Sequence, residues 1–140
     1  MKRWLTAIGI CLLIGSWANA KEPYSPEYSK CLEHADGNDF NSRDCNSSEF
    51  EIQDGLLNQK YQKLLKAVEE GGYGDEQTDT RLKKDIRAAQ RLWVQFRDKN
   101  CEVHYLAAGG GTYSAVAGTY CMLEMTVQRA KELKDLLPSE

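Results

Sequence analysis

The chain lacks the sequence motifs of several large enzyme and ligand-binding classes. Its 140 residues contain no GxSxG nucleophile motif and no CxxC pair, and the two histidines do not have the spacing of zinc ligands. The glycine run at residues 109–111 is not followed by the lysine of a phosphate-binding loop. No stretch alternates apolar and polar residues as a half-buried strand does. We therefore expect an all-α protein that is not an enzyme and holds no cofactor or metal.

Positive charge is not in excess either. The chain has 18 Lys and Arg against 21 Asp and Glu, for a net charge of −3. Two of the basic residues and none of the acidic ones lie in residues 1–20, which leaves 16 basic against 21 acidic residues and a charge of −5 in the remainder. A mildly acidic chain is a poor candidate for binding nucleic acid or an anionic lipid surface. A basic protein is a better match as a partner.

Only one long apolar run occurs, and it lies at the N-terminus. It spans residues 4–17, follows two basic residues and ends before a small-x-small cleavage site at residues 18–20. Because the run is too short to cross a bilayer, we interpret residues 1–20 as a cleaved signal peptide. We expect residues 21–140 to be one periplasmic or secreted domain without a membrane segment. Lipid attachment at Cys11 is the alternative, but a large residue precedes this cysteine where a lipoprotein signal has a small one.

The remaining cysteines favour disulfide bonds. An even number in a small exported chain is typical of two disulfides, with catalytic or metal-bound thiols as the alternative. Three pairings are possible for Cys31, Cys45, Cys101 and Cys121. Closeness along the chain favours a bond between the first two. An antiparallel hairpin around the glycine run would place the last two at matching levels, which favours a bond between them.

Apolar residues recur at steps of three and four, which predicts three long helices. A capping box at residues 48–51 begins the first, and two glycines at residues 71–72 end it. The second runs from about residue 79 to 106, and the third from about 114 to 137 before Pro138. The expected inward faces consist of Phe50, Leu57, Tyr61, Leu64 and Val68; then Leu82, Ile86, Ala89, Trp93 and Phe96; then Ala115, Thr119, Met122, Thr126, Ala130, Leu133 and Leu137.

Residues 21–46 lack such a stripe. Ser25 and Pro26 can start a short helix that ends near Gly37, since proline is tolerated in a first turn. Residues 38–46 are polar and predicted to form a loop. The expected architecture is therefore a small antiparallel bundle of three main helices with a short disulfide-tethered N-terminal segment.

Four polar side chains interrupt the apolar stripes, namely Asp54, Asn58, Gln90 and Arg97. A charge on a buried face is costly unless it is paired. Because the first two long helices should be antiparallel, we expect an Asp54–Arg97 or Asn58–Gln90 contact that fixes their register. The alternative is a binding or catalytic cluster that brings Asp54, Arg97 or His104 into one pocket, but a slim bundle offers little concave space.

The ordered motifs carry a family resemblance. A cysteine precedes Asp54-x-x-Leu57-Asn58-x-x-Tyr61, and Gln90-x-x-Trp93, Phe96-Arg97-Asp98-x-x-Cys101, the glycine turn, Cys121, Thr126, Arg129 and Leu133 follow. From Cys31 onward the chain resembles the small exported domains grouped with the N-terminal domain of the lysozyme inhibitor LprI. The resemblance implies an exported, helical, disulfide-bonded protein that inhibits lysozyme. It assigns no inhibitory residue.

Two function hypotheses follow. The first is a non-covalent inhibitor of a cell-wall hydrolase, with a basic lysozyme as the leading partner; the second is an envelope accessory or immunity-type protein that binds another protein. Two loops are candidate contact sites, because each places flexible glycines beside a tyrosine expected to be exposed. Their residues are Tyr73 in one loop, and Gly109, Gly110, Gly111, Thr112 and Tyr113 in the other. Trp93 is expected in the core rather than in an interface, and the oligomeric state is not defined by the sequence.

Overall fold

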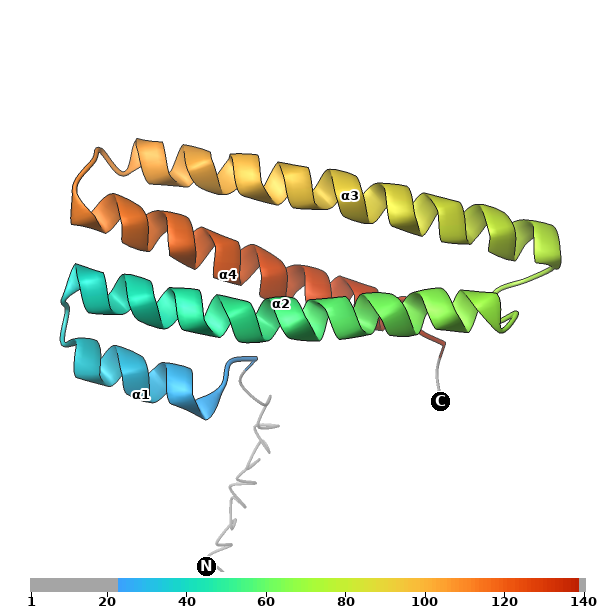
Figure 1. Ribbon diagram of the computed structural model, residues 1–140, viewed down its shortest axis with the longest axis horizontal. Coiled ribbons are helices and arrows are strands. Elements are labelled where there is room, and N and C mark those ends of the chain that lie inside the picture. Colours follow the sequence, from blue (N-terminus) through green and yellow to red (C-terminus); the bar gives the residue numbers. More distant parts are fainter. Residues whose placement is uncertain (1–22, 139–140) are drawn as a thin grey trace, which may run out of the picture.

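Helices account for nearly all of the residues that the structure describes. The computed structural model describes residues 23–138, within which no strand occurs. Its helices are α1 (Pro26–Ala35), α2 (Asp39–Glu69), α3 (Glu76–Ala107) and α4 (Thr112–Asp135). Figure 1 shows α2, α3 and α4 running lengthwise beside one another, with α1 along the first half of α2. The predicted all-α bundle of three main helices with a short N-terminal segment is confirmed. The predicted signal peptide, residues 1–20, lies outside the described residues.

Local capping signals explain where the helices begin. The Ser25 hydroxyl accepts a hydrogen bond from the Tyr28 N–H at 3.2 Å, and Pro26 occupies the first turn of α1. Asn38 caps α2 and Asp75 caps α3 in the same way. These signals lie immediately before each helix, so the starts of α1, α2 and α3 are set by local sequence.

The prediction of a loop at residues 38–46 was wrong. The helix α2 already starts at Asp39, so the supposed capping box at Ser48 lies well inside it. The first turns of α2 bury Cys45, Asn46 and Glu49, two of which are polar. An apolar stripe is therefore missing from this part of α2, although the helix is packed on its neighbours.

The core consists of two clusters along the bundle. One contains Leu57, Leu64, Ala130 and Leu133, and the partly buried Trp93 packs against it, which puts Trp93 on the core side as expected. The other contains Tyr28, Ala35, Cys45 and Leu123. The helix α4 packs against both α2 and α3, and its apolar residues join the clusters.

The predicted inward face of α3 needs correction. Ala89 and Phe96 were expected in the core, but both are exposed. The helix instead turns Gln90, Arg97 and Cys101 inward. Two of these three residues are polar. A prediction from apolar residues alone therefore placed the buried face of α3 to one side of its true position.

Two disulfides tie the helices together. Cys31–Cys45 joins α1 to α2 with a Cα–Cα distance of 5.7 Å, and Cys101–Cys121 joins α3 to α4 with a distance of 5.4 Å. These are the pairings that sequence separation and hairpin geometry favoured. They fix α1 on the bundle and fix the α3–α4 hairpin near its turn.

Candidate functional site: the acidic end of the bundle

The two predicted contact loops lie at opposite ends of the molecule. In Figure 1 the α1–α2 and α3–α4 turns share one end, and the α2–α3 turn lies at the other end, near the last residues of α4. Tyr73 and the turn at residues 109–113 therefore cannot belong to one contact surface.

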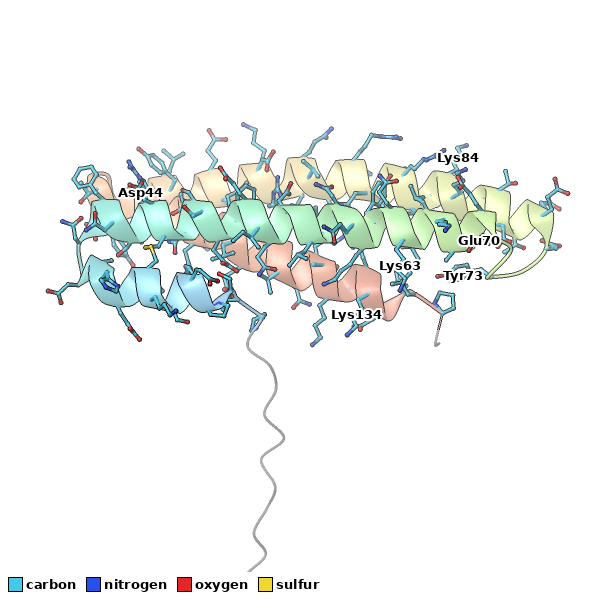
Figure 2. All side chains as sticks on the ribbon, turned by 60° about the horizontal axis from the view of Figure 1, so that its bottom comes forward. Asp44, Lys63, Glu70, Tyr73, Lys84 and Lys134 are labelled. Atoms are coloured by element: carbon cyan, nitrogen blue, oxygen red, sulfur yellow. A yellow bond between two sulfur atoms is a disulfide. The ribbon has the colours of Figure 1, made fainter. Side chains whose placement is uncertain are left out.

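Tyr73 is half-buried rather than exposed as expected. Its hydroxyl donates to the Leu136 carbonyl oxygen at 2.5 Å, and its ring packs against the core cluster of Leu57 and Leu64. Burial raises the pKa of the Tyr73 hydroxyl above its usual value. Tyr73 thus fastens the α2–α3 turn to the end of α4, as Figure 2 shows, and presents little surface to a partner.

The glycine turn is well placed for contact. Gly109, Gly110 and Gly111 have φ angles of +83°, +89° and +78°, a backbone region that favours glycine. The Gly110 N–H donates to the hydroxyl of Ser114, a fully buried residue, at 2.9 Å. Beside this turn, Tyr113 is 61% exposed. The turn is therefore held by an internal hydrogen bond while its aromatic neighbour faces solvent.

A second turn joins the glycine turn at this end. The Thr112 hydroxyl donates to the Asp39 carboxylate at 2.7 Å, which links the start of α4 to the start of α2. Next to Asp39, Phe40 is 56% exposed. Asp39 and Phe40 were not predicted as contact residues, because both fell in the predicted loop. The signal that could have found them is Asn38, a cap residue followed by an acidic first turn.

Negative charge is concentrated around these turns. Residues 23–54, which form α1 and the first half of α2, contain eight acidic and only two basic side chains. The other described residues, 55–138, contain eleven acidic and thirteen basic ones. In Figure 2, Asp44 lies toward the end that holds the α1–α2 and α3–α4 turns. Lys63, Lys84 and Lys134 lie toward the end that holds the α2–α3 turn. We call the surface of α1, residues 36–44 and residues 109–113 the acidic end.

The polar residues on the helix stripes form a separate, internal network. The buried Arg97 guanidinium donates to Asp54 at 3.1 Å, to Thr126 at 3.2 Å and to Asp98 at 3.0 Å. It also lies 5.2 Å from the ring centroids of Phe50 and Trp93. This side chain connects α2, α3 and α4, and the Asp54–Arg97 contact is one of the two expected from the sequence.

The other predicted members have different partners. The Asn58 amide donates to Asp54 at 3.1 Å, whereas the Gln90 amide oxygen accepts from Arg129 of α4 at 3.1 Å. His104 is exposed, two turns beyond Arg97 on α3. The structure thus brings Asp54, Asn58 and Arg97 together without Gln90 or His104. The buried Arg97 guanidinium makes three hydrogen bonds to protein groups, which suits a structural role.

Two further features are absent from residues 23–138. No helix in this range is long and apolar enough to cross a membrane. Nor does the range hold a group of three or more His, Cys, Asp or Glu side chains arranged to bind a metal ion.

The fold and the cysteine pattern define a small, disulfide-bonded helical bundle with an acidic end. The model of the family described as "Lysozyme inhibitor LprI" matches residues 31–133, and the chain belongs to this family. It is 28% identical to an uncharacterized protein of Rhizobium meliloti over 142 aligned residues, which cover 99% of this chain and 98% of the relative. It is also 28% identical to the uncharacterized protein YecT of Escherichia coli over 97 residues, or 66% of this chain and 60% of YecT. No solved structure matches the chain significantly.

Proposed function

We propose that this protein is an exported, non-catalytic inhibitor that docks its acidic end on a basic cell-wall hydrolase, with a lysozyme as the target. The observation that carries the proposal is the excess of negative charge at the acidic end, with five acidic against two basic side chains, beside two exposed aromatic residues, Phe40 and Tyr113. Membership of a family described as lysozyme inhibitors supports the choice of target.

The acidic end combines features that suit a protein interface. Its charge would attract a basic partner and raise the association rate. Exposed aromatic side chains are frequent binding anchors, and Phe40 and Tyr113 lie in the first turns of α2 and α4, which the Thr112–Asp39 hydrogen bond joins. Because hydrogen bonds and the nearby disulfides already order these turns, docking would require little loss of conformational entropy.

The internal network gives no support to a catalytic alternative. Asp54 accepts hydrogen bonds from both Arg97 and Asn58, and Arg97 is buried among protein groups. A general acid or base needs a free proton-transfer position in a cleft, whereas the Asp54 carboxylate is already paired with the Arg97 guanidinium. The proposal therefore assigns Asp54, Asn58, Gln90 and Arg97 to the scaffold.

Export is part of the proposal. Residues 1–20 act as a cleaved signal peptide, and residues 21–140 form the mature periplasmic or secreted domain. The two disulfides support this placement, because such bonds persist in oxidising compartments.

The test is a lysis assay with the oxidised protein and basic lysozymes of several classes. We expect saturable inhibition that weakens as salt is added. Tyr113→Ala should weaken inhibition by about tenfold or more, as for an interface anchor. Leu136→Ala is the matched control, since Leu136 is similarly exposed at the opposite end. Absence of inhibition by folded protein would refute the proposed target and favour a different envelope partner.

A further inference from the structure

A row of apolar side chains lies exposed along α3. Leu92, Phe96, Val103 and Leu106 are between 60% and 66% exposed. They fall on the side of the helix that α2 and α4 leave uncovered, since α3 turns Gln90, Arg97 and Cys101 inward. Exposed apolar side chains gathered on one face of a helix often mark an interaction site.

The spacing of this row is that of a helix–helix seam. Together with the exposed Ala89 and Lys99, the four residues follow alternating steps of three and four along α3. This is the a/d heptad pattern of a two-helix coiled coil. We define the α3 seam as Ala89, Leu92, Phe96, Lys99, Val103 and Leu106.

The seam is complementary to itself when two copies run antiparallel. Pairing each a position with a d position places Ala89 opposite Leu106, Leu92 opposite Val103, and Phe96 opposite Lys99 of the second copy. Reading the row from either end gives the same layers, as a two-fold interface between identical chains requires. A parallel pair would instead place Lys99 against Lys99, which is a like-charge contact.

Charge also favours the antiparallel arrangement. The Phe96 ring borders a groove of about 530 Å³ that Glu124, Gln128 and Glu132 of α4 also line. Lys99 of a second copy would lie over this ring, as in a cation–π contact, and beside these carboxylates. In one copy Lys99 is exposed and pairs with Glu102, also exposed, at 2.7 Å, so its ammonium can reach across.

We propose that the protein forms a two-fold homodimer through antiparallel pairing of the α3 seam. The paired segment is about 26 Å long at 1.5 Å per residue. A single helix pair of this length is smaller than a standard interface, so we expect a dissociation constant in the micromolar range. This inference does not depend on hydrolase inhibition.

Sedimentation equilibrium of the full oxidised protein over a concentration series tests the dimer. Leu92→Glu should raise the dissociation constant by at least about 100-fold, because each dimer would bury two new charges against Val103 of the other copy. Ile52→Glu, at an exposed apolar residue of α2, is the control and should leave the dimer unchanged. Unchanged circular dichroism of both variants excludes misfolding as the cause.

A charge-pair rescue tests the register. Ala89→Lys and Leu106→Glu should each weaken the dimer, whereas the double variant should regain at least about tenfold of the lost affinity, because each lysine then faces a glutamate. A protein that stays monomeric up to about 1 mM overturns the dimer. A dimer that is insensitive to Leu92→Glu overturns the α3 seam, and failure of the rescue overturns the antiparallel register.

Discussion

Among the described residues, Glu49 is the most deeply buried acidic side chain, with 1% of its surface exposed. Its carboxylate accepts hydrogen bonds from the Ser25 N–H at 2.9 Å, the Ser25 hydroxyl at 2.5 Å and the Gln53 amide at 2.7 Å. These donors replace the water that a buried carboxylate loses. The Gln53 amide also donates to the Pro23 carbonyl oxygen at 2.8 Å. One carboxylate thus anchors the start of α1 to α2.

Replacing Glu49 by alanine should lower the free energy of unfolding by about 2–4 kcal/mol, because the buried donors of Ser25 and Gln53 lose their acceptor. Urea denaturation at neutral pH measures this change. Glu51→Ala, two residues along and exposed, is the control and should change the free energy by less than about 0.5 kcal/mol. Equal effects of the two substitutions would contradict an anchoring role.

Tyr28 should make the fold sensitive to alkali. Its hydroxyl donates to Asn46 at 2.8 Å, and burial, aided by Tyr120, Glu124 and Glu49, raises its pKa to about 12. The stability from this raised pKa is fully present below the unfolded value of about 10 and is lost as pH rises through 12. We expect the free energy of unfolding to fall by about 2 kcal/mol across this window.

Tyr28→Phe separates this effect from general alkaline unfolding. At pH 8 the free energy of unfolding of the variant should be about 1 kcal/mol lower, because the variant lacks the hydrogen bond to Asn46. Above pH 10 this free energy should fall less steeply than that of the unaltered protein. Urea denaturation at a series of pH values compares the two proteins. Parallel declines above pH 10 would show that Tyr28 does not cause the sensitivity.

The polar contacts differ in how far the sequence could predict them. Asp54 and Arg97 interrupt apolar stripes, so their pairing across antiparallel helices could be expected and is present. Asn46 and Glu49 were missed because the first turns of α2 have no apolar stripe, so no pattern marks these two residues as buried. The partner of Gln90 could not be predicted from two helices, because Arg129 comes from α4.

At the scale of elements, α1 depends on its attachments. It has ten residues, fewer than an isolated helix needs for stability in water. Its anchors are the Cys31–Cys45 disulfide, the Ser25–Glu49 hydrogen bonds and the Tyr28–Asn46 bond, all to α2. By contrast, the Cys101–Cys121 bond joins two long helices that also share a packed interface.

The two disulfides should therefore protect different parts of the fold. Replacing Cys31 and Cys45 by serine should speed amide hydrogen exchange mainly in α1 and leave the middle of α3 and α4 protected. Replacing Cys101 and Cys121 should lower the stability of the whole bundle by about 3 kcal/mol, as for a loop of that length. Exchange measured by mass spectrometry distinguishes the two patterns. Equal loss of protection along the chain in both variants would contradict the distinction.

The long helices were predictable because caps, glycines and apolar spacing agree along most of them. The first turns of α2 were not, since Asn46 and Glu49, which the helix buries there, are polar. The face of α3 was misplaced for a related reason. Phe96 is more apolar than Arg97, but Arg97 has partners in the core, and the apolar surplus remains exposed as the α3 seam.

At the scale of the whole molecule, charge is distributed unevenly along the bundle. The acidic end combines most of the uncompensated negative charge with Phe40 and Tyr113, and the opposite end mixes both signs, as at Glu70 and Lys84 in Figure 2. An uneven field of this kind orients a charged partner before contact. If the protein binds a basic lysozyme, the association rate should depend more on where the negative charge lies than on the net charge.

This expectation can be tested with two double variants that change the net charge equally. Asp36→Lys with Asp44→Lys reverses charge at the acidic end, whereas Glu70→Lys with Glu76→Lys does so at the opposite end; all four residues are exposed. In stopped-flow association with a basic lysozyme at low salt, the first variant should bind about tenfold more slowly and the second nearly as fast as the unaltered protein. The difference should disappear near 1 M salt, where the Debye length is about 3 Å. Equal slowing of both variants would mean that net charge alone sets the rate, and the acidic end would then lose its role as the docking surface.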